Sequence, residues 1–172
     1  MIEEEKKELS KKMQMVSMDD AGITSDEKPI IATQALATCF GILVYDEKSK
    51  KASLAHASST WEISIVKLLK LLDFKESHIY KFAIIPGYYS KQEDHYHVEK
   101  SLRDFFHSIE SLNIKFIPFL DKEIPSNAIA LDENTLSYEF AYDADAREFV
   151  TEKVVFGIPY LEVNEKVKKI VN

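Results

Sequence analysis

The chain has 172 residues, and its 29 acidic residues outnumber its 22 basic residues, which gives a net charge of −7. Its apolar fraction of 45% and charged fraction of 30% are typical of a soluble globular domain rather than of a disordered chain. The acidic balance disfavours binding to nucleic acid or to an anionic membrane surface, because both favour basic patches. No apolar run is long enough to span a bilayer as a helix.

The N-terminal residues mix Glu and Lys and lack the apolar stretch of a secretory signal peptide. We therefore expect cytoplasmic synthesis, and export as an effector would have to use a route without a classical signal peptide. Residues 1–28 are predicted to be an appendage, partly helical or flexible, because a turn-like Asp-Asp-Ala-Gly segment follows the charged region. A single α+β domain is predicted over residues 29–164, followed by a tail at 165–172.

Short apolar or β-branched segments within this domain predict strands. They lie at residues 30–31, 40–45, 52–56, 79–85, 114–120, 128–131, 136–142 and 154–163. Two segments have a helical period instead. The first has a stripe of Ile63, Val66, Leu69 and Leu72, and the second spans residues 92–112. This pattern predicts a layered sandwich of mainly antiparallel strands with two principal helices.

The segments before and after Asp46-Glu47-Lys48-Ser49 predict a β-hairpin. A two-residue loop, or a four-residue loop closed by Tyr45 and Lys50, makes paired residue numbers sum to 95 and places the only cysteine, Cys39, opposite His56. Directly opposed residues have Cβ atoms about 4.5–5.5 Å apart. At that distance an imidazole can take the proton of a thiol, which predicts an activated thiolate for nucleophilic catalysis. The alternative is an inert core cysteine beside an ordinary histidine.

The segments Leu36-Ala37-Thr38-Cys39, Tyr45-Asp46 and Ala55-His56, together with Thr33, resemble the signature of the CheD chemoreceptor glutamine deamidases. More distantly, they resemble toxin deamidases of the cytotoxic necrotizing factor type. The family pattern has a threonine six residues before the cysteine and a histidine seventeen after it, and this chain keeps both spacings. The resemblance covers roughly residues 30–140.

The resemblance implies a CheD-like fold and a cysteine-dependent protein glutamine deamidase that needs no metal or organic cofactor. Cys39 would be the nucleophile, His56 the base and Thr33 the residue that orients the imidazole; the partner would be a protein carrying a reactive glutamine. A straight strand would separate Thr33 from Cys39 by roughly 20 Å, so this role requires a sharp bend near residues 34–37.

Two alternatives remain open at this point. The family usually has a glycine beside the cysteine and this chain has none, which favours a deamidase-like binding module that is catalytically weak or inactive. The same thioester chemistry would also serve a cysteine transglutaminase or protease. A metal site at His95 and His97 is disfavoured, because residues two apart on a helix point to different sides.

Overall fold

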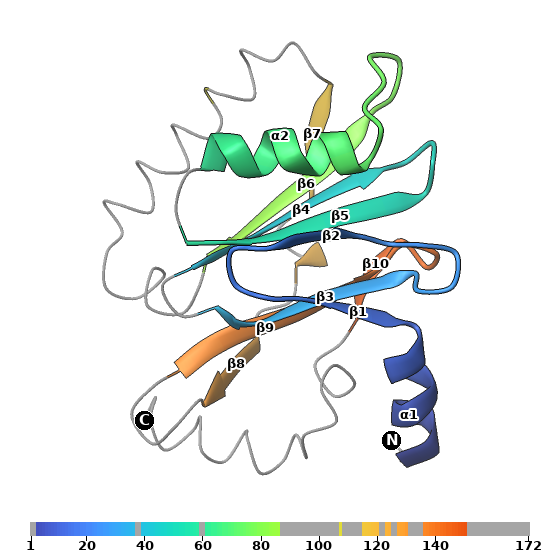
Figure 1. The fold of residues 1–172 in the computed structure, drawn as a ribbon, viewed down its shortest axis with the longest axis vertical. Coiled ribbons are helices and arrows are strands. Elements are labelled where there is room, and N and C mark those ends of the chain that lie inside the picture. The colour runs from blue at the N-terminus through green and yellow to red at the C-terminus, as the bar shows by residue number, and fades with distance from the viewer. Residues whose placement is uncertain are drawn as a thin grey trace.

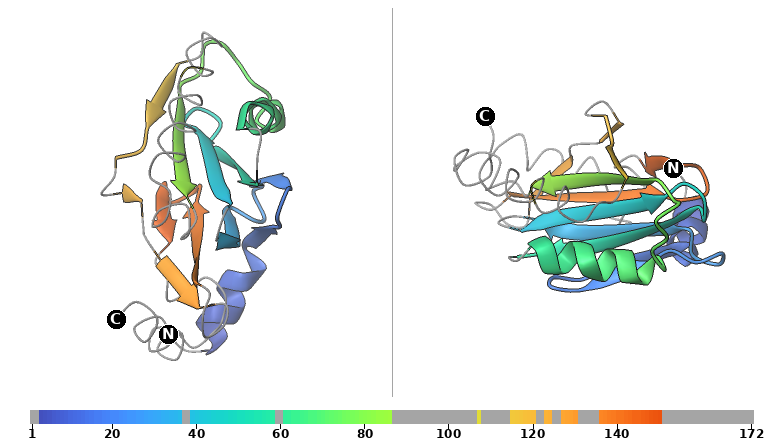
Figure 2. Two further views of the ribbon diagram at one scale, coloured as in Figure 1. Left: turned by 90° about the vertical axis from the view of Figure 1, so that its left-hand side faces the viewer. Right: turned by 90° about the horizontal axis from the view of Figure 1, so that it is seen from above.

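The computed structural model describes residues 3–36, 39–58, 61–86, 107, 115–120, 123–124, 127–130 and 136–150. Within these ranges the chain has an α+β architecture in which two β-sheets lie face to face and a helix covers the outer face of one of them (Figures 1 and 2). No helix in the described part is long and apolar enough to cross a membrane.

In the part of the chain that the structure describes, each sheet contains five strands. The first sheet has the order β1-β3-β9-β10, with β8 also paired to β9. Its strands are β1 (Met13–Val16), β3 (Ile30–Leu36), β8 (Asn127–Ala130), β9 (Leu136–Asp143) and β10 (Glu148–Val150). The second sheet has the order β2-β5-β4-β6-β7. Its strands are β2 (Ala21–Ile23), β4 (Phe40–Asp46), β5 (Lys51–Ala57), β6 (Tyr80–Pro86) and β7 (Phe116–Pro118).

Both sheets are mixed. The pairs β1–β3 and β6–β7 are parallel, and the other pairs in the described ranges are antiparallel. The two helices of the described part are α1 (Glu3–Lys11) and α2 (Trp61–Leu71). The segments predicted as a helix at 92–112, a strand at 154–163 and a tail at 165–172 lie outside the described residues, apart from His107.

The main core lies between the sheets. Leu43, Leu54 and Phe140 are fully buried there, with strand alternation sending every second side chain inward. The opposite face of the second sheet packs on α2, where Ile42 and Leu68 belong to a second cluster. Strand β4 is therefore buried on both faces, which explains its almost continuous apolar sequence.

Helix α2 was expected from a stripe that included Val66. The helix is present, and the predicted Leu69 and Leu72 are buried against the sheet together with Ile65 and Leu68, whereas Val66 is 41% exposed. The side chain of Ile63 lies outside the described residues. The predicted stripe is therefore correct at Leu69 and Leu72 and wrong at Val66, and it did not include Ile65 and Leu68. The cause is that β-branched and leucine residues surround the true stripe on both sides, so apolar character alone does not mark the buried face.

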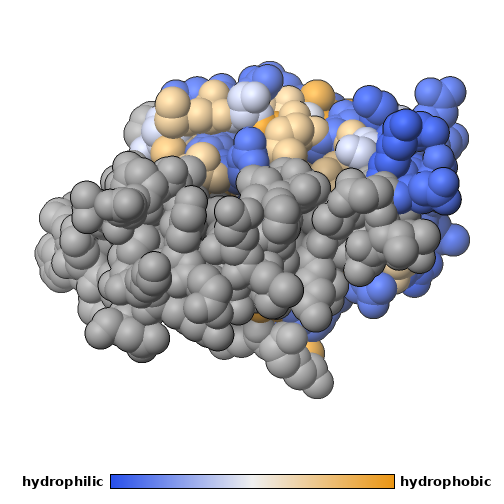
Figure 3. Space-filling view, turned by 90° about the horizontal axis from the view of Figure 1, so that it is seen from below, coloured by the Kyte–Doolittle hydropathy of each residue, from blue (hydrophilic) through white to orange (hydrophobic). Residues whose placement is uncertain are grey.

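A third, smaller apolar cluster lies on the outer face of the first sheet. It contains Ile30, Ala32 and Ala141, and the partly buried Leu9 of α1 packs against it. Seen from below, the described surface combines a strongly hydrophilic region with a group of apolar residues (Figure 3). Leu9 thus attaches helix α1 to the outer face of the first sheet.

The N-terminal segment belongs to the sandwich. Strand β1 pairs with β3 in the first sheet, and β2 pairs with β5 in the second. Residues 13–23 therefore contribute one edge strand to each layer, whereas the sequence predicted an appendage up to residue 28. These strands are three or four residues long, too short for an alternating pattern to be recognised.

Candidate active site

The β4–β5 hairpin fixes which residues face His56. Asp46 pairs with Lys51 around a four-residue turn, and Gly41 lies directly opposite His56. The predicted pairing of Cys39 with His56 is therefore wrong by two residues, since paired numbers sum to 97 and not 95. A shift of two keeps every side chain on its face of the sheet. Continuing the ladder would place Cys39 diagonal to His56, at a typical separation of about 7–8 Å or somewhat less.

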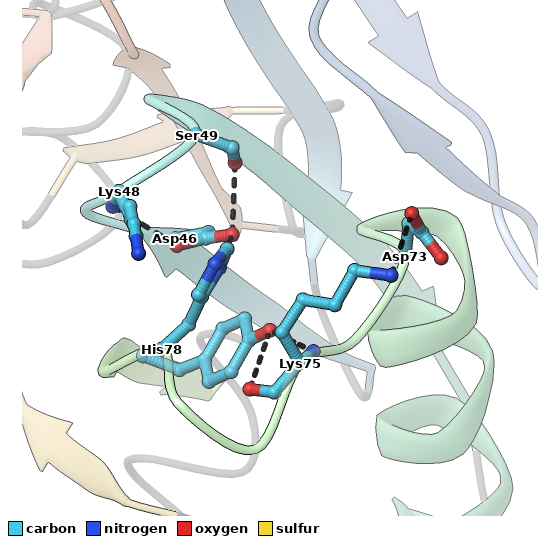
Figure 4. Close-up of polar contacts among 7 residues, drawn as sticks. Asp46, Lys48, Ser49, Asp73, Lys75 and His78 are labelled. Carbon is cyan, nitrogen blue, oxygen red and sulfur yellow. Dashed lines mark hydrogen bonds and ion pairs between the residues drawn. The ribbon is translucent and has the colours of Figure 1, made fainter.

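The turn itself explains the register. The Asp46 carboxylate accepts hydrogen bonds from the Lys48 amide at 3.0 Å and the Ser49 hydroxyl at 2.9 Å (Figure 4). The Lys50 amide bonds to the Asp46 carbonyl oxygen at 2.8 Å, and Lys50 has a positive φ of 57°. Asp46 therefore precedes a four-residue turn at residues 47–50, whereas the sequence analysis expected it to pair with Ser49 or to lie inside a four-residue loop closed by Tyr45 and Lys50.

His78 secures the same turn from outside the hairpin. Its Nδ1 lies 2.8 Å from the Asp46 carboxylate, which is completely buried (Figure 4). Burial alone would raise the pKa of Asp46, but the hydrogen bonds from His78, Ser49 and the turn amides outweigh it and lower the pKa. The ionised carboxylate thus stabilises the turn that sets the register of the candidate site.

His56 contacts Thr33 across the space between the two sheets. The Thr33 hydroxyl oxygen lies 2.9 Å from Nδ1 of His56 and 2.8 Å from the carbonyl oxygen of Val16, to which it donates. A hydroxyl has one proton, so Thr33 must accept its second hydrogen bond, and Nδ1 of His56 must carry the hydrogen. The other ring nitrogen, Nε2, is then the basic one.

A backbone irregularity brings Thr33 to this position. The register of β3 against β9 shifts by one residue between Thr33 and Leu36, and Ala35 has a positive φ of 61°. Such a bulge bends the strand. The irregularity lies where the sequence analysis placed a bend on the condition that Thr33 belongs to the site. The chain can therefore leave Thr33 in the first sheet and enter the second sheet at Phe40.

His56 is almost completely buried, with 2% of its surface exposed. Burial lowers the pKa of the imidazole, and the negative charge of Asp19 acts in the opposite direction. The ring is therefore neutral at neutral pH. Among the described residues, no group forms a hydrogen bond with the buried Nε2. This nitrogen is an acceptor inside the protein, as a general base must be.

Cys39 belongs to the core between the sheets and is 5% exposed. It shares this cluster with Leu36 and Phe140. The structure thus brings Thr33 and His56 into direct contact and places Cys39 on the same inner side of the second sheet. The three predicted residues are held by different elements, β3, β5 and the chain just before β4.

Gly41 is a site residue that the sequence analysis did not identify. A Cβ atom at this position would lie 2.4 Å from Cε1 and 2.8 Å from Cζ of Phe140, far inside contact distance. The absence of a side chain at Gly41 therefore allows the Phe140 ring to lie against β4. Gly41 is the residue that pairs directly with His56. The only available sequence signal was a glycine inside a strand, which often marks a close approach.

The sequence analysis also considered a metal site at His95 and His97. His95 and His97 lie outside the described residues. The Asp143 carboxylate accepts hydrogen bonds from the amides of Asp145 and Ala146, so this acidic segment forms the β9–β10 turn. In the described ranges no group of three metal-ligating side chains comes together.

Comparison with models of known protein families finds no match to this chain, and no curated protein has significant sequence similarity to it. The function proposed below therefore depends on the geometry of Thr33, Cys39 and His56 and on the resemblance of their spacing to a known pattern.

Proposed function

We propose that the protein is a cysteine-dependent protein glutamine deamidase with a CheD-like arrangement of its site. The observation that carries this proposal is the hydrogen-bond chain from His56 through Thr33 to the Val16 carbonyl, which leaves Nε2 as a buried base. A third group that fixes the tautomer of a catalytic histidine is characteristic of nucleophile–base sites. The spacing of Thr33, Cys39 and His56 supports the same reading.

The chemistry would proceed in two steps. Nε2 of His56 takes the Cys39 thiol proton while sulfur attacks the carboxamide carbon of a glutamine side chain, and backbone N–H donors stabilise the oxyanion. The imidazolium then gives its proton to the leaving nitrogen, which departs as ammonia and leaves a thioester. Water, deprotonated by His56, hydrolyses the thioester to glutamate and restores the thiol. No metal or organic cofactor takes part.

A specific observation favours a second candidate, a deamidase-like binding module with little or no catalysis. Thr33, Cys39 and His56 are each at most 5% exposed, so a glutamine side chain needs a path to them. A binding module would keep the hydrogen-bonded core without requiring such a path. A transglutaminase or protease would use the same nucleophile but a different acceptor.

The test is ammonia release from glutamine-containing proteins, with the modified residue located by mass spectrometry. We expect the wild type to convert glutamine to glutamate, Cys39→Ala to be inactive, and Lys67→Ala, at an exposed position on α2, to match the wild type. Deamidation that persists in a folded Cys39→Ala variant would overturn the proposal. Amine incorporation or peptide cleavage instead of ammonia release would identify the transglutaminase or protease alternative.

A further inference from the structure

The turn between β1 and β2, residues 17–20, holds the backbone of His56 through two hydrogen bonds. The Asp19 amide donates to the His56 carbonyl oxygen at 2.8 Å, and the His56 amide donates to the Asp20 carbonyl oxygen at 3.1 Å. No other turn in the described ranges forms two hydrogen bonds with this residue. The histidine is therefore held by the N-terminal segment as well as by the ladder of β5.

The side chain of Asp19 adds a second attachment. Its carboxylate accepts hydrogen bonds from both the amide and the hydroxyl of Ser58, two residues after His56. Asp19 has a φ of 60°, a left-handed conformation that Asp and Asn adopt more readily than most residues. The residue type, its conformation and its hydrogen bonds thus agree in placing a carboxylate at the end of β5.

The same N-terminal segment controls the other side of the imidazole. The carbonyl oxygen of Val16, the last residue of β1, accepts the hydrogen bond of the Thr33 hydroxyl. Thr33 must therefore accept from His56, which fixes the hydrogen on Nδ1 of the imidazole. Two consecutive features, the end of β1 and the turn that follows it, therefore both act on one histidine. The number of hydrogen bonds to His56 and Thr33 is greater than the pairing of two short edge strands requires.

We propose that residues 16–20 are a positioning element of the active site, in which Asp19 holds the end of β5 and presents a negative charge to His56. The inference rests on the proposed function for its catalytic meaning, but its physical content is independent of any substrate. Of the titratable groups on the elements packed around His56, Asp19 and Asp20 belong to the turn, and Cys39 belongs to the chain just before β4. The facing strands β1, β2 and β3 carry no titratable side chain along their lengths.

The decisive variant is Asp19→Asn. Asparagine keeps an oxygen that accepts from Ser58 and tolerates the positive φ, so it removes the charge with little change of structure. Because the Asp19 charge raises the pKa of His56, the imidazole should titrate at a lower pH in the variant. Asp20→Asn is the matched control, since its carboxylate bonds to the Ala21 amide and its charge is not among those that shift His56.

Titration would be followed by NMR of the imidazole protons, with the His56 resonance identified by its loss in His56→Gln. We expect a shift to lower pH in Asp19→Asn, no shift in Asp20→Asn, and a smaller difference in concentrated salt, which screens an exposed charge. An unchanged titration in Asp19→Asn, or an equal shift in both variants, would overturn the inference. Ammonia release tests the deamidase proposal separately, so failure of one is distinguishable from failure of the other.

Discussion

At the scale of single residues, the Thr33 hydroxyl decides what His56 can do. It accepts from Nδ1 and donates to the Val16 carbonyl, so the basic nitrogen of the ring is the one on the opposite edge. Without the hydroxyl, the imidazole could turn or take the other tautomer. Loss of the Thr33 hydroxyl should lower stability more than its small volume suggests, because two buried polar groups, Nδ1 of His56 and the Val16 carbonyl, form hydrogen bonds with it.

Thr33→Val is expected to lower deamidation and Cys39 alkylation by about tenfold or more, because a misoriented base is a poor proton acceptor. It should also lower the free energy of unfolding by about 1–3 kcal/mol, since the variant leaves buried polar groups unpaired. Thr33→Ser restores the hydroxyl and should recover most of the activity. Equal rates in the Val and Ser variants would show that the hydrogen bond has no role in the chemistry.

Glu139 lies on the face of β9 opposite the active site and is 6% exposed. Burial raises its pKa to about 8, so the folded protein holds its proton at neutral pH whereas the unfolded chain does not. Its contribution to stability is complete below the ordinary glutamate pKa and is lost as the pH rises through about 8.

Glu139→Gln removes this dependence. Relative to the wild type, the variant should gain free energy of unfolding steadily from weakly acidic pH to above about 8, measured by urea unfolding across that range. Glu148→Gln, at an exposed position of β10, is the control and should show little change. A wild-type to Glu139→Gln difference that is constant with pH would mean that Glu139 ionises normally in the fold.

At the scale of elements, the β4–β5 turn sets the geometry of the site through the position at which the two strands pair, Asp46 with Lys51. Lys50, its last residue, has a positive φ of 57°. Such a conformation costs an L-residue roughly 1–2 kcal/mol, while glycine adopts it freely. Lys50→Gly should therefore raise the free energy of unfolding by about 0.5–1 kcal/mol.

Lys48→Gly in the same turn is the matched control. Lys48 is a described residue without a positive φ, so glycine there should give no gain and a loss of up to about 1 kcal/mol. Chemical denaturation of both variants measures the difference. If Lys48→Gly stabilised the protein and Lys50→Gly did not, the four-residue turn and the register that follows from it would be wrong.

Gly41 and Phe140 couple the two sheets next to His56. Gly41→Ala should lower the free energy of unfolding by about 1–3 kcal/mol through overpacking against the ring. Gly22→Ala, whose nearest side-chain atom would lie at 3.3 Å, should cost less. In a double-mutant cycle, Phe140→Leu should relieve part of the Gly41→Ala loss, and strictly additive losses would contradict the predicted contact.

The sequence predicted most of the strands in the described part, because seven-residue apolar segments such as β4 and β6 carry a strong pattern. It failed on the hairpin register, since an aspartate can stand before a turn or within one, and only its hydrogen bonds decide. It also missed β1 and β2, whose pairing is a property of the assembled sheets. The sequence could predict the Thr33–His56 contact only on the condition that the chain bends between Thr33 and Cys39, because a bulge has no reliable sequence signal.

At the scale of the whole molecule, the candidate site contains residues from both sheets, and the N-terminal segment packs beside it. Thr33 belongs to the first sheet and His56 to the second, so their hydrogen bond depends on how the sheets pack. Strands β1 and β2 form one edge of each sheet. The residues of β1 and β2 therefore contribute to core packing, to the edges of the sheets and to the geometry around His56. Their loss should affect all three.

Two truncations test this dependence. Removal of residues 1–11 takes away α1, which contributes the partly buried Leu9 and an exposed Lys11–Glu8 ion pair. We expect a loss of about 1 kcal/mol or less, because surface ion pairs contribute little and one apolar side chain is only half covered. Removal of residues 1–24 also removes β1, β2 and the buried Val16, which leaves the edges of β3 and β5 without their hydrogen-bond partners.

The longer truncation should therefore lose cooperative urea unfolding, whereas the shorter one should keep it together with the wild-type His56 titration. The physical reason is that the truncation removes the ladder hydrogen bonds of β3 and β5, each worth about 0.5–1.5 kcal/mol net, and the buried Val16, against a total stability of about 5–15 kcal/mol for a typical domain. If the chain without residues 1–24 unfolds as cooperatively as the chain without residues 1–11, the N-terminal strands are dispensable. The fold would then begin near residue 29, as the composition of the sequence had suggested.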